Sequence, residues 1–453
     1  MATITETSWV TRAARRSAGK ILRDRVSRST HGAWKPVERE RDPIAILRKT
    51  DAGRVKTLLP IRYGRMRTSP FAFLRGSAAV MAFDLASTPT TGIPVQACGD
   101  AHLMNFGGFA TPERNIIFDV NDFDETLPAP WEWDIKRLAA SVMVAGRYRG
   151  FGGGRCADAV LATVRAYREK LREFSRLTPL EIWHARIEAH DVVDMVSQHD
   201  VRRLREEAAG LMHVHTAGHL LPKMVVMRNG KLRIKDDPPL IFHEPGHDGY
   251  VRIAHALERY CGSLSDEHRA LLERYRFVDA ALKVVGVGSV GTRCAVALFL
   301  AEDDEPLFLQ FKEARPSVLE PYVGRSKYQN HGQRVVVGQR AMQSASDIFL
   351  GWSSTGNSGF DFYVRQLRDI KTSVNLDALK PSTFATYASH CACALARAHA
   401  KTGDAAMISG YLGKSDSFDR ALLAFARSYS SATEGDYDAL VKAIDSGQVS
   451  ADR

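Results

Sequence analysis

Apolar side chains recur at helical spacing over most of the chain. The segment MRTSPFAFLRGSAAVMAFDLA (66–86) carries such positions after a Ser-Pro start, and it predicts a helix. From Trp131, WEWDIKRLAASVMVAGRYR predicts an amphipathic helix closed by the glycine-rich run GFGGG. Further helical regions are expected at 1–60, 155–212, 250–275, 325–347 and 377–445.

Strand-like alternation is confined to shorter segments. Residues 279–313 alternate strongly and predict a β-meander, and 361–370 predict a further strand. Residues 222–242 predict a hairpin around Asn229-Gly230, a dipeptide that favours tight turns. Two β-type runs, IPVQAC and NIIFDV, flank an acidic stretch near position 100. We therefore expect an α+β fold with strands in two zones and helices around them.

Composition narrows the classes of protein that fit. The chain is 45% hydrophobic and 25% charged, as is ordinary for a globular protein. It has no run of about 18 apolar residues and no apolar signal core at its N-terminus, which argues against a membrane span and favours a cytoplasmic location. The six cysteines form no CxxC pair, which argues against a structural zinc site.

The net charge of +10 is concentrated near the N-terminus. Seven basic residues face only Asp24 there: Arg12, Arg15, Arg16, Lys20, Arg23, Arg25 and Arg28. An arm that contacts nucleic acid or anionic lipid is one interpretation. Because no aromatic interleaving or binding motif accompanies the charge, we favour a solvated basic helix, and no nucleic-acid partner is expected.

The stretch VQACGDAHLMNFGGFATPERNIIFDVNDFDE (95–125) carries the candidate chemistry. Asp100 and Asn105 lie five residues apart, and Asp122 follows the strand-like run NIIFDV. Such a set suits phosphoryl transfer, in which one carboxylate orients the attacking hydroxyl while an amide oxygen and a second carboxylate hold Mg²⁺. Two further carboxylates are secondary metal candidates, Asp119 and Asp124.

GDAHLMN resembles the catalytic loop G-D-x-H-x-x-N of the aminoglycoside phosphotransferase and choline kinase branch of the protein-kinase-like superfamily. NDFDE resembles the metal-binding segment that follows it, and the start of the helix at Trp131, with Asp134, resembles the next helix. The resemblance implies that Asp100 is the catalytic base, that Asn105 and Asp122 bind Mg²⁺ and that His102 structures the loop. The run GDAHLMNFG…NDFDE also resembles a bacterial family defined only as a domain of unknown function, and the resemblance to that family covers nearly the whole chain.

Other interpretations of this stretch stay open. Asp100-x-His102 matches the first motif of binuclear metallophosphoesterases, but the later GDxxD and GNH[DE] motifs are missing. DVNDFDE resembles the start of an EF-hand, without the glycine and glutamate that such a loop requires. A loop of caps and Asx-turns without catalytic function is the third alternative.

A glycine-rich loop and a lysine follow far downstream. KVVGVGSVGTRCAVALFL offers Gly286, Gly288, Ser289 and Gly291 to cover phosphates, and LQFK ends on Lys312, which would pair with the α- and β-phosphates. A dinucleotide-binding unit would need a helix after the glycines, whereas two β-type runs with a turn follow here. A tight turn and a surface lysine remain the alternative interpretation.

The acidic partner of Lys312 is less evident. Glu320 is the early candidate in the next predicted helix, whose core, GQRVVVGQRAMQ, contains no acid. Either Glu320 pairs with Lys312 or the usual ion pair is altered. The late segment TYASHCACALARAHA resembles the helix that precedes the catalytic loop in small-molecule kinases, and we expect it to lie beside 66–86.

The order of these segments is inverted relative to a kinase, so the hypothesis is a circularly permuted, two-lobed kinase-like fold with helical additions. The expected parts are a basic helical segment at 1–65, the catalytic and metal loops at 66–150 and a helical region with an inserted hairpin at 151–275. A small nucleotide-binding lobe at 276–372 and a C-terminal helical part at 373–453 follow. A joint phosphate and metal site requires Lys312 to lie within about 10 Å of Asp122.

The sequence thus predicts an ATP- and Mg²⁺-dependent phosphotransferase that acts on a hydroxyl or amine of a small-molecule acceptor. Two alternatives stay open, a nucleotidyl transferase on the same fold and a non-catalytic nucleotide-binding regulator. The sequence does not identify the acceptor or the oligomeric state.

Overall fold

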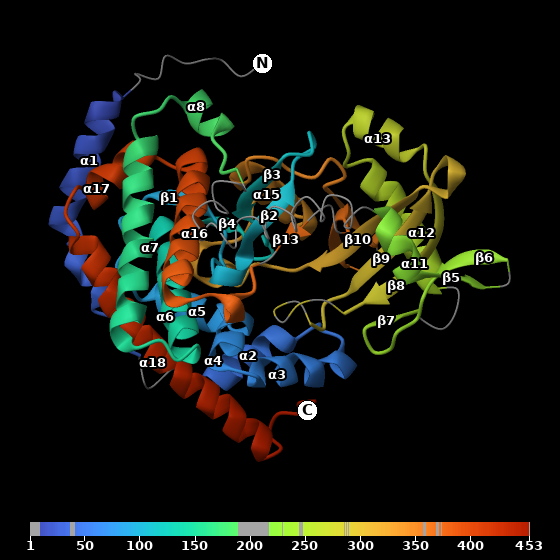
Figure 1. The fold of residues 1–453 in the computed structure, drawn as a ribbon, viewed down its shortest axis with the longest axis horizontal. Coiled ribbons are helices and arrows are strands. Elements are labelled where there is room, and N and C mark those ends of the chain that lie inside the picture. Colours follow the sequence, from blue (N-terminus) through green and yellow to red (C-terminus); the bar gives the residue numbers. More distant parts are fainter. Residues whose placement is uncertain are drawn as a thin grey trace.

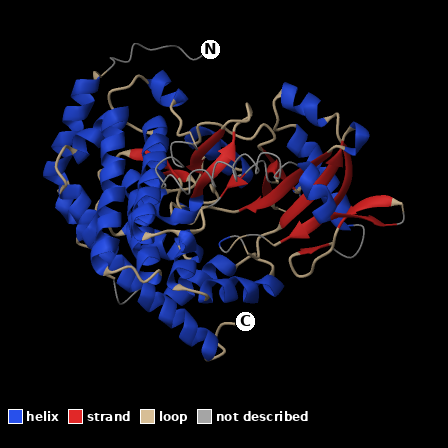
Figure 2. Ribbon diagram, viewed as in Figure 1, coloured by secondary structure: helices blue, strands red, loops and turns tan. Residues whose placement is uncertain are grey.

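The computed structural model describes residues 10–36, 41–188, 217–228, 230–243, 248–284, 286, 288, 290–356, 359–367, 371–372 and 374–452. Its elements form two parts that lie side by side (Figures 1 and 2). One part consists almost entirely of helices, and the other is built on a six-stranded sheet. This mixture of helix and strand confirms the predicted α+β class.

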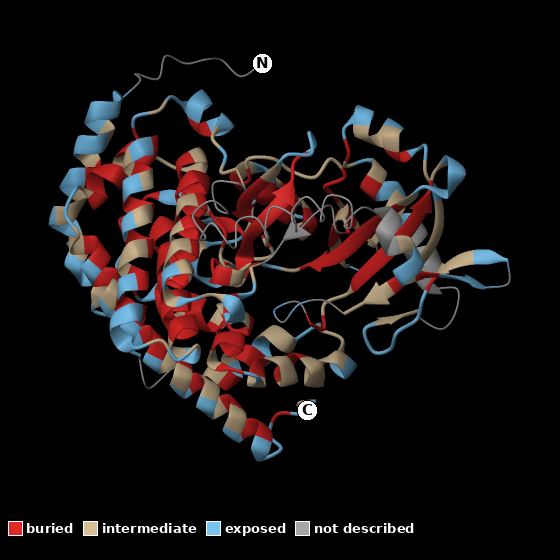
Figure 3. Ribbon diagram, in the orientation of Figure 1, coloured by how far each residue is buried: buried red, intermediate tan, exposed pale blue. Residues whose placement is uncertain are grey.

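The helical part is organised around α6 (Trp131–Tyr148), which is buried along most of its length. Beside it, α7 (Gly153–Phe174) packs against α16 (Pro381–Thr402), and α18 (Ser417–Asp445) contacts both α6 and α7. Figure 3 shows how buried residues gather on the inner helices while the outer ones face solvent. The other helices here are α1 (Arg12–Arg25), η1 (Arg28–Gly32), α2 (Pro43–Asp51), η2 (Lys56–Leu58), α3 (Leu59–Arg67), α4 (Pro70–Gly76), α5 (Ala78–Ala86), α8 (Pro179–His184), η7 (Leu376–Ala378) and α17 (Ala405–Leu412).

The basic N-terminal segment is packed rather than free in solvent. Helix α1 lies along α17. Arg23 donates hydrogen bonds to the carbonyl oxygens of Gly410 and Tyr411 at 2.5 and 2.8 Å, and Arg28 donates to that of Leu412 at 2.8 Å. These are carbonyls at the C-terminal end of a helix, where cations are favoured. Part of the basic cluster therefore caps α17.

The six-stranded sheet has the order β11-β12-β10-β9-β8-β7. Strands β8 (Arg276–Lys283), β9 (Cys294–Leu300) and β10 (Pro306–Ala314) pair antiparallel in succession, which confirms the predicted meander. β9 is buried throughout, which explains its continuous apolar sequence. The outer strands are β7 (Ile241–Phe242), β11 (Gly351–Ser354) and β12 (Asp361–Gln366), and the helices of this part are α11 (Ala217–Met224), α12 (Asp248–Cys261), α13 (Asp266–Leu272), η5 (Glu302–Asp304), α14 (Glu320–Val323) and α15 (His331–Met342).

Three smaller sheets are also present in the part of the chain that the structure describes. β5 (Val225–Arg228) and β6 (Lys231–Ile234) form the predicted hairpin, although Asn229 lies outside the described residues. β2 (Phe106–Ala110) pairs with β3 (Ile116–Val120) and with β13 (Lys371–Thr372). β1 (Pro94–Ala97) pairs with β4 (Leu127–Pro130). Strand β4 tolerates its prolines because it pairs on only one side.

Two helix predictions were wrong in detail. Residues 66–86 span the end of α3, then α4 and α5, because Ser69 caps α4 through a bond from Ala72 N and the chain bends again at Ser77. The late segment became α16, but it packs mainly on α7 rather than beside 66–86. Among the residues that the structure describes, no helix combines the length and apolar character needed to cross a membrane.

Candidate functional site

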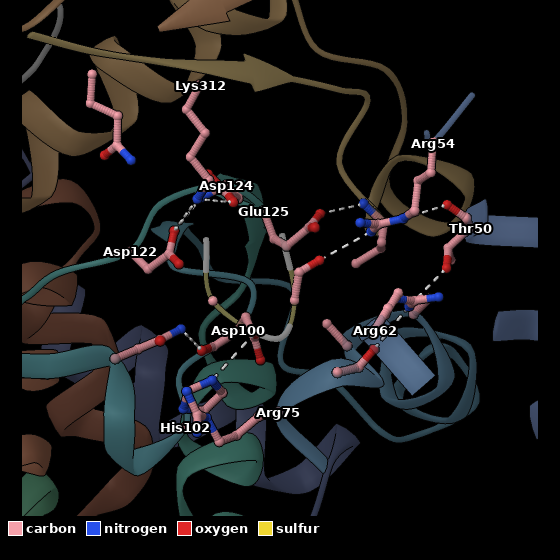
Figure 4. A pocket seen from close by; sticks show the side chains of 18 of the residues that line it. Thr50, Arg54, Arg62, Arg75, Asp100, His102, Asp122, Asp124, Glu125 and Lys312 are labelled. Atoms are coloured by element: carbon pink, nitrogen blue, oxygen red, sulfur yellow. Dashed lines mark hydrogen bonds and ion pairs between the residues drawn. The ribbon is translucent and has the colours of Figure 1, made fainter. Parts of the chain in front are cut away.

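A cavity of about 220 Å³ lies where the two parts meet, and it brings together seven of the predicted site residues. They are Asp100, Asn105, Asp122, Asp124, Gly286, Gly288 and Lys312. Figure 4 shows Lys312 reaching into the cavity from one side, while Asp100 and His102 lie on the other. Segments about 190 residues apart in sequence thus share one site.

The loop that carries Asp100 is fixed by a buried carboxylate. Asp134, in the first turn of α6, accepts hydrogen bonds from the backbone N–H groups of Cys98 and Gly99 at 2.6 and 2.9 Å. His399 Nε2 lies 3.1 Å from the same carboxylate. Gly99 has a φ of +80°, and a Cβ there would lie 2.5 Å from the Glu125 carbonyl oxygen. The sharp turn before Asp100 therefore requires glycine.

Asp100 is the predicted base, and its carboxylate is held by one arginine. Arg137 of α6 donates Nε to Asp100 Oδ1 at 2.6 Å and Nη2 to the Leu74 carbonyl oxygen at 2.7 Å. Burial raises the pKa of Asp100 to about 6, with Arg137 opposing and Asp122 assisting that shift. Asp100 is thus mostly ionised at neutral pH while remaining a better proton acceptor than an exposed aspartate.

A short hairpin explains how Asn105 and Asp122 meet. β2 and β3 pair with Phe106 opposite Val120, so the residues that flank this pair leave the same end of the hairpin. The N–H of Asn121 donates to the Asn105 carbonyl oxygen at 2.8 Å and ties the two loops together. The Asn105 side chain donates Nδ2 to the Asp100 carbonyl oxygen at 2.6 Å. This leaves the Asn105 amide oxygen as the group that could bind a metal ion, and Asp122, whose side chain is 38% exposed, lines the same cavity.

A magnesium ion would have few protein ligands here. Within the described ranges, no three His, Cys, Asp or Glu side chains converge on one point where a metal ion could sit. Asp124 forms an ion pair with Lys312, which leaves the Asn105 amide oxygen and the Asp122 carboxylate as ligands for a metal ion. Such a pair fits Mg²⁺, which keeps several waters and uses one or two carboxylates together with substrate phosphates.

Asp119 is not part of the site, which corrects its candidacy as a metal ligand. It is fully buried on β3 and accepts from Arg397 Nη2 at 2.7 and 2.8 Å and from Ser344 N at 3.0 Å. Alternation along β3 directs its side chain into the core between the hairpin and α16.

Lys312 of β10 makes the contact that joins the two parts. Its Nζ lies 2.5 Å from Asp124 Oδ2 and 3.8 Å from Asp122 Oδ1, well within the separation that the sequence hypothesis required. Tyr363 donates its hydroxyl to the other Asp124 oxygen at 2.8 Å. Burial alone would lower the pKa of Lys312, but Asp122 and Asp124 hold it well above its ordinary value. The ammonium is therefore charged.

Glu320 is not the partner of Lys312, and it does not line the cavity. It lies on α14, 3.9 Å from His331 Nδ1. In place of an acid, α15 carries Arg334, which donates to the carbonyl oxygens of Asp124 and Thr126 at 2.7 Å each. Helix α15 thus holds the loop of Asp122 and Asp124 through its backbone carbonyls, and Asp124 supplies the charge that pairs with Lys312.

The glycine-rich loop is only partly as predicted. Gly286 and Gly288 line the cavity, Gly291 does not, and Ser289 lies outside the described residues. Gly291 has a φ of +87°, and its carbonyl oxygen accepts from Val55 N at 2.8 Å. Arg54 donates to the carbonyl oxygens of Val290 and Gly288 at 2.6 and 3.1 Å. The turn after α2 therefore fastens this loop over the cavity.

His102 serves the loop itself. Its Nδ1 accepts from Met104 N at 3.2 Å, and burial with the nearby cations Arg75 and Arg137 lowers its pKa well below the ordinary value. The neutral ring therefore caps the short helix η3 (Leu103–Asn105), which sets the position of Asn105.

Sequence reasoning missed several charged lining residues, namely Arg54, Arg62, Arg75, Glu125 and Arg365. They come from five separate segments, so no local motif connects them. Two signals were available: Glu125 ends the quoted segment NDFDE, and Arg75 is a charge inside the apolar run FAFLRG. A charged residue in such a run needs a polar environment, and here the cavity supplies it.

The fold and the site define an α+β protein with a charged cavity between a helical part and an antiparallel sheet. The chain belongs to the family described as "Uncharacterized protein conserved in bacteria (DUF2252)", whose family model matches residues 54–443. No curated protein and no solved structure is significantly similar to it.

Proposed function

We propose that this protein is an ATP- and Mg²⁺-dependent phosphotransferase with a two-lobed, kinase-like fold whose segments are circularly permuted. The observation that carries the proposal is the position of Lys312 Nζ, 3.8 Å from Asp122 in the cavity that also contains Asp100. A phosphate-binding lysine, a metal-binding carboxylate and a base in one cavity are the parts that phosphoryl transfer needs.

The order of the chain supports the permutation. The catalytic and metal loops come from the first third of the sequence, and the sheet with the glycines and Lys312 follows them. The sheet part then corresponds to the small lobe and the helical part to the large lobe. Arg54 and Val55, in the turn after α2, form hydrogen bonds with the glycine-rich loop of the other part. These contacts support one site built from both parts.

Each residue then has a defined role. Asp100 orients the acceptor hydroxyl or amine and takes its proton as the new bond to the γ-phosphorus forms and the bond to the bridging oxygen of ADP breaks. Lys312 has three N–H donors, so it can keep Asp124 and still pair with the α- and β-phosphates. Gly286 and Gly288 cover the phosphates closely because no side chain intervenes.

Asn105 and Asp122 would hold Mg²⁺ through their side-chain oxygens. The bound ion would offset the negative charge of the phosphates. The resemblance of GDAHLMN to the small-molecule branch of the kinase-like superfamily favours a small-molecule acceptor rather than a protein.

Thermal unfolding in the presence of ATP, with and without Mg²⁺, tests the proposal. The wild type should be stabilised by ATP and more so by ATP with Mg²⁺, because a ligand that binds only the folded state raises its stability. Asp122→Ala should abolish the added effect of Mg²⁺, and Lys312→Ala should weaken the effect of ATP itself. Two exposed residues give matched controls, Asp158→Ala on α7 and Lys231→Ala on β6.

The proposal fails if ATP stabilises all five proteins equally or none of them. Analysis of the nucleotide product separates the alternatives, since a phosphotransferase releases ADP and a nucleotidyl transferase releases pyrophosphate. Binding without any turnover would indicate a regulator.

A further inference from the structure

The side of the cavity next to Asp100 contains an arginine, Arg75, that forms no hydrogen bond or ion pair with the carboxylates of the site, although Asp100 and Asp122 lie near enough to oppose the lowering of its pKa by burial. Arg75, at the end of α4, lines this side and lies beside His102 and Asp100 (Figure 4). Its Nε is buried without a partner, and none of its guanidinium nitrogens forms a hydrogen bond or ion pair with any described residue. An unpaired, largely buried guanidinium is costly unless an anion occupies the space in front of it.

The N-terminus of α5 faces the same space. Gly76, Ala78 and Ala79 line the cavity there. Val80 N and Met81 N both donate to the Ser77 carbonyl oxygen, whereas the first N–H groups of a helix, those of Ala78 and Ala79, have no acceptor within it. Unpaired N–H groups and the positive end of the helix dipole favour an anion at this position.

Two more arginines line the cavity. Arg62 is neutralised by Asp51. Arg54 instead donates to the carbonyl oxygens of Thr50, Gly288 and Val290, and burial beside Arg62 and Arg315 lowers its pKa to about 9. Because acidic residues also line the cavity, it is Arg75, which forms no ion pair with a described residue, that favours an anionic acceptor on this side.

The phosphates of ATP have other partners. Lys312 lies on the opposite side of the cavity from Arg75 (Figure 4). The glycine-rich loop comes close to the end of α4, since a Cβ on Gly288 would lie 3.6 Å from the Arg75 carbonyl oxygen. The anion that Arg75 and the α5 N-terminus would bind is therefore a second one, next to the base.

We propose that the acceptor is a small phosphate monoester with a free hydroxyl, bound through its phosphate by Arg75 and the N-terminal amides of α5. This inference rests on the proposed function. The hydroxyl oxygen bonds to the γ-phosphorus of ATP, its proton passes to Asp100, and the bond to the bridging oxygen breaks. The products are ADP and a bisphosphate.

Calorimetric titration of the full-length protein with inorganic phosphate and with glycerol 3-phosphate tests this, with choline chloride as the cationic comparison. Each is titrated with and without a saturating non-hydrolysable ATP analogue and Mg²⁺. Both phosphates should bind the nucleotide-loaded protein, and choline should not. Arg75→Gln should weaken phosphate binding by about tenfold, the loss expected for one charge-assisted contact, and Arg75→Lys by less.

Ala79→Asp gives a second variant that does not depend on removing a buried arginine. A carboxylate in the first turn of α5 is compatible with the helix but repels an anion, so phosphate binding should fall while unfolding stability is kept. Lys312→Ala should reduce affinity for the ATP analogue and leave phosphate binding unchanged.

Phosphate binding that competes with the ATP analogue, that survives both Arg75→Gln and Ala79→Asp, or that is matched by choline would overturn the inference. If the ATP analogue itself does not bind, the proposed phosphotransferase function fails. Phosphate binding to the nucleotide-free protein and its dependence on Arg75 then decide separately whether the anion site exists.

Discussion

Lys312 Nζ lies 2.5 Å from Asp124 Oδ2, although 188 positions separate the two residues in the chain. The acid that pairs with this lysine therefore comes from the loop that carries Asp122 in the helical part, and not from α14 or α15, the helices that follow β10. This ion pair couples the sheet to that loop. A shift of one part relative to the other would therefore displace both Lys312 and Asp122.

Asp124→Asn should destabilise the protein and weaken ATP binding. The amide cannot balance the Lys312 ammonium, whose side chain is only 5% exposed, and loss of a charge-assisted hydrogen bond there costs about 2 kcal/mol. Urea unfolding at pH 7 measures the stability, and titration with ATP measures the affinity. Glu320→Gln is the matched control and should leave ATP affinity unchanged, because Glu320 lies outside the cavity. A larger loss of affinity in Glu320→Gln would contradict the assigned pairing.

The Lys312–Asp124 pair illustrates which features of the site the sequence could predict and which it could not. Asp100, Asn105 and Asp122 were found because a loop, a hairpin and a second loop form within one short stretch, where spacing determines proximity. The β8-β9-β10 meander was predicted for the same reason. The partner of Lys312 depends instead on how two parts dock, and no local pattern encodes that. Arg54 and Arg75 were missed because each is an isolated arginine whose role depends on the distant residues around it.

Turnover of ATP should fall as the pH drops below about 6. Burial raises the pKa of Asp100 from 3.8 to about 6, so the basic form is lost below that pH, by about tenfold per pH unit. Because the pKa is raised in the folded state, the protonated form favours folding below pH 3.8, and that contribution is lost as the pH rises through 6. Slow transfer of the γ-phosphoryl group of ATP to water, measured as ADP release, should provide the assay when no acceptor is present.

Arg137→Lys sharpens this test. Arg137 opposes the upward shift of the Asp100 pKa. A lysine is shorter and would interact more weakly with the Asp100 carboxylate, so the midpoint of the pH profile should move to a higher value. Asp100→Asn should remove turnover at every pH. A midpoint that stays in place in Arg137→Lys would exclude Asp100 as the group that titrates.

Substitution of two glycines in the glycine-rich loop should affect different properties, stability in one case and ATP binding in the other. Gly291 has a φ of +87° and its Cβ would lie 3.2 Å from Arg54 Cβ, so Gly291→Ala should cost about 1 kcal/mol of unfolding free energy. Gly286 has no atom within 4 Å of an added Cβ, so Gly286→Ala should keep the stability. Because Gly286 lines the cavity, the added methyl group should instead weaken ATP binding. Equal effects of both substitutions on stability and binding would rule out this division of roles.

Asp134→Asn should disrupt the loop that carries Asp100 without touching the cavity. The Asp134 carboxylate is buried and accepts from Cys98 N and Gly99 N, while His399 contacts it from α16. An amide keeps only one acceptor oxygen, so one of these donors is left unpaired at a cost of about 2–3 kcal/mol.

Tyr167→Phe is the control for that substitution. It removes only the outer hydrogen bond, from the Tyr167 hydroxyl to His399 Nδ1 at 2.7 Å, and should cost about 1 kcal/mol. Urea unfolding compares the two variants, and ATP turnover reports on Asp100. We expect Asp134→Asn to lose turnover while Tyr167→Phe keeps most of it, because only the first changes the backbone that positions the base. Equal turnover in both would mean that the turn at Gly99 holds Asp100 in place without the carboxylate.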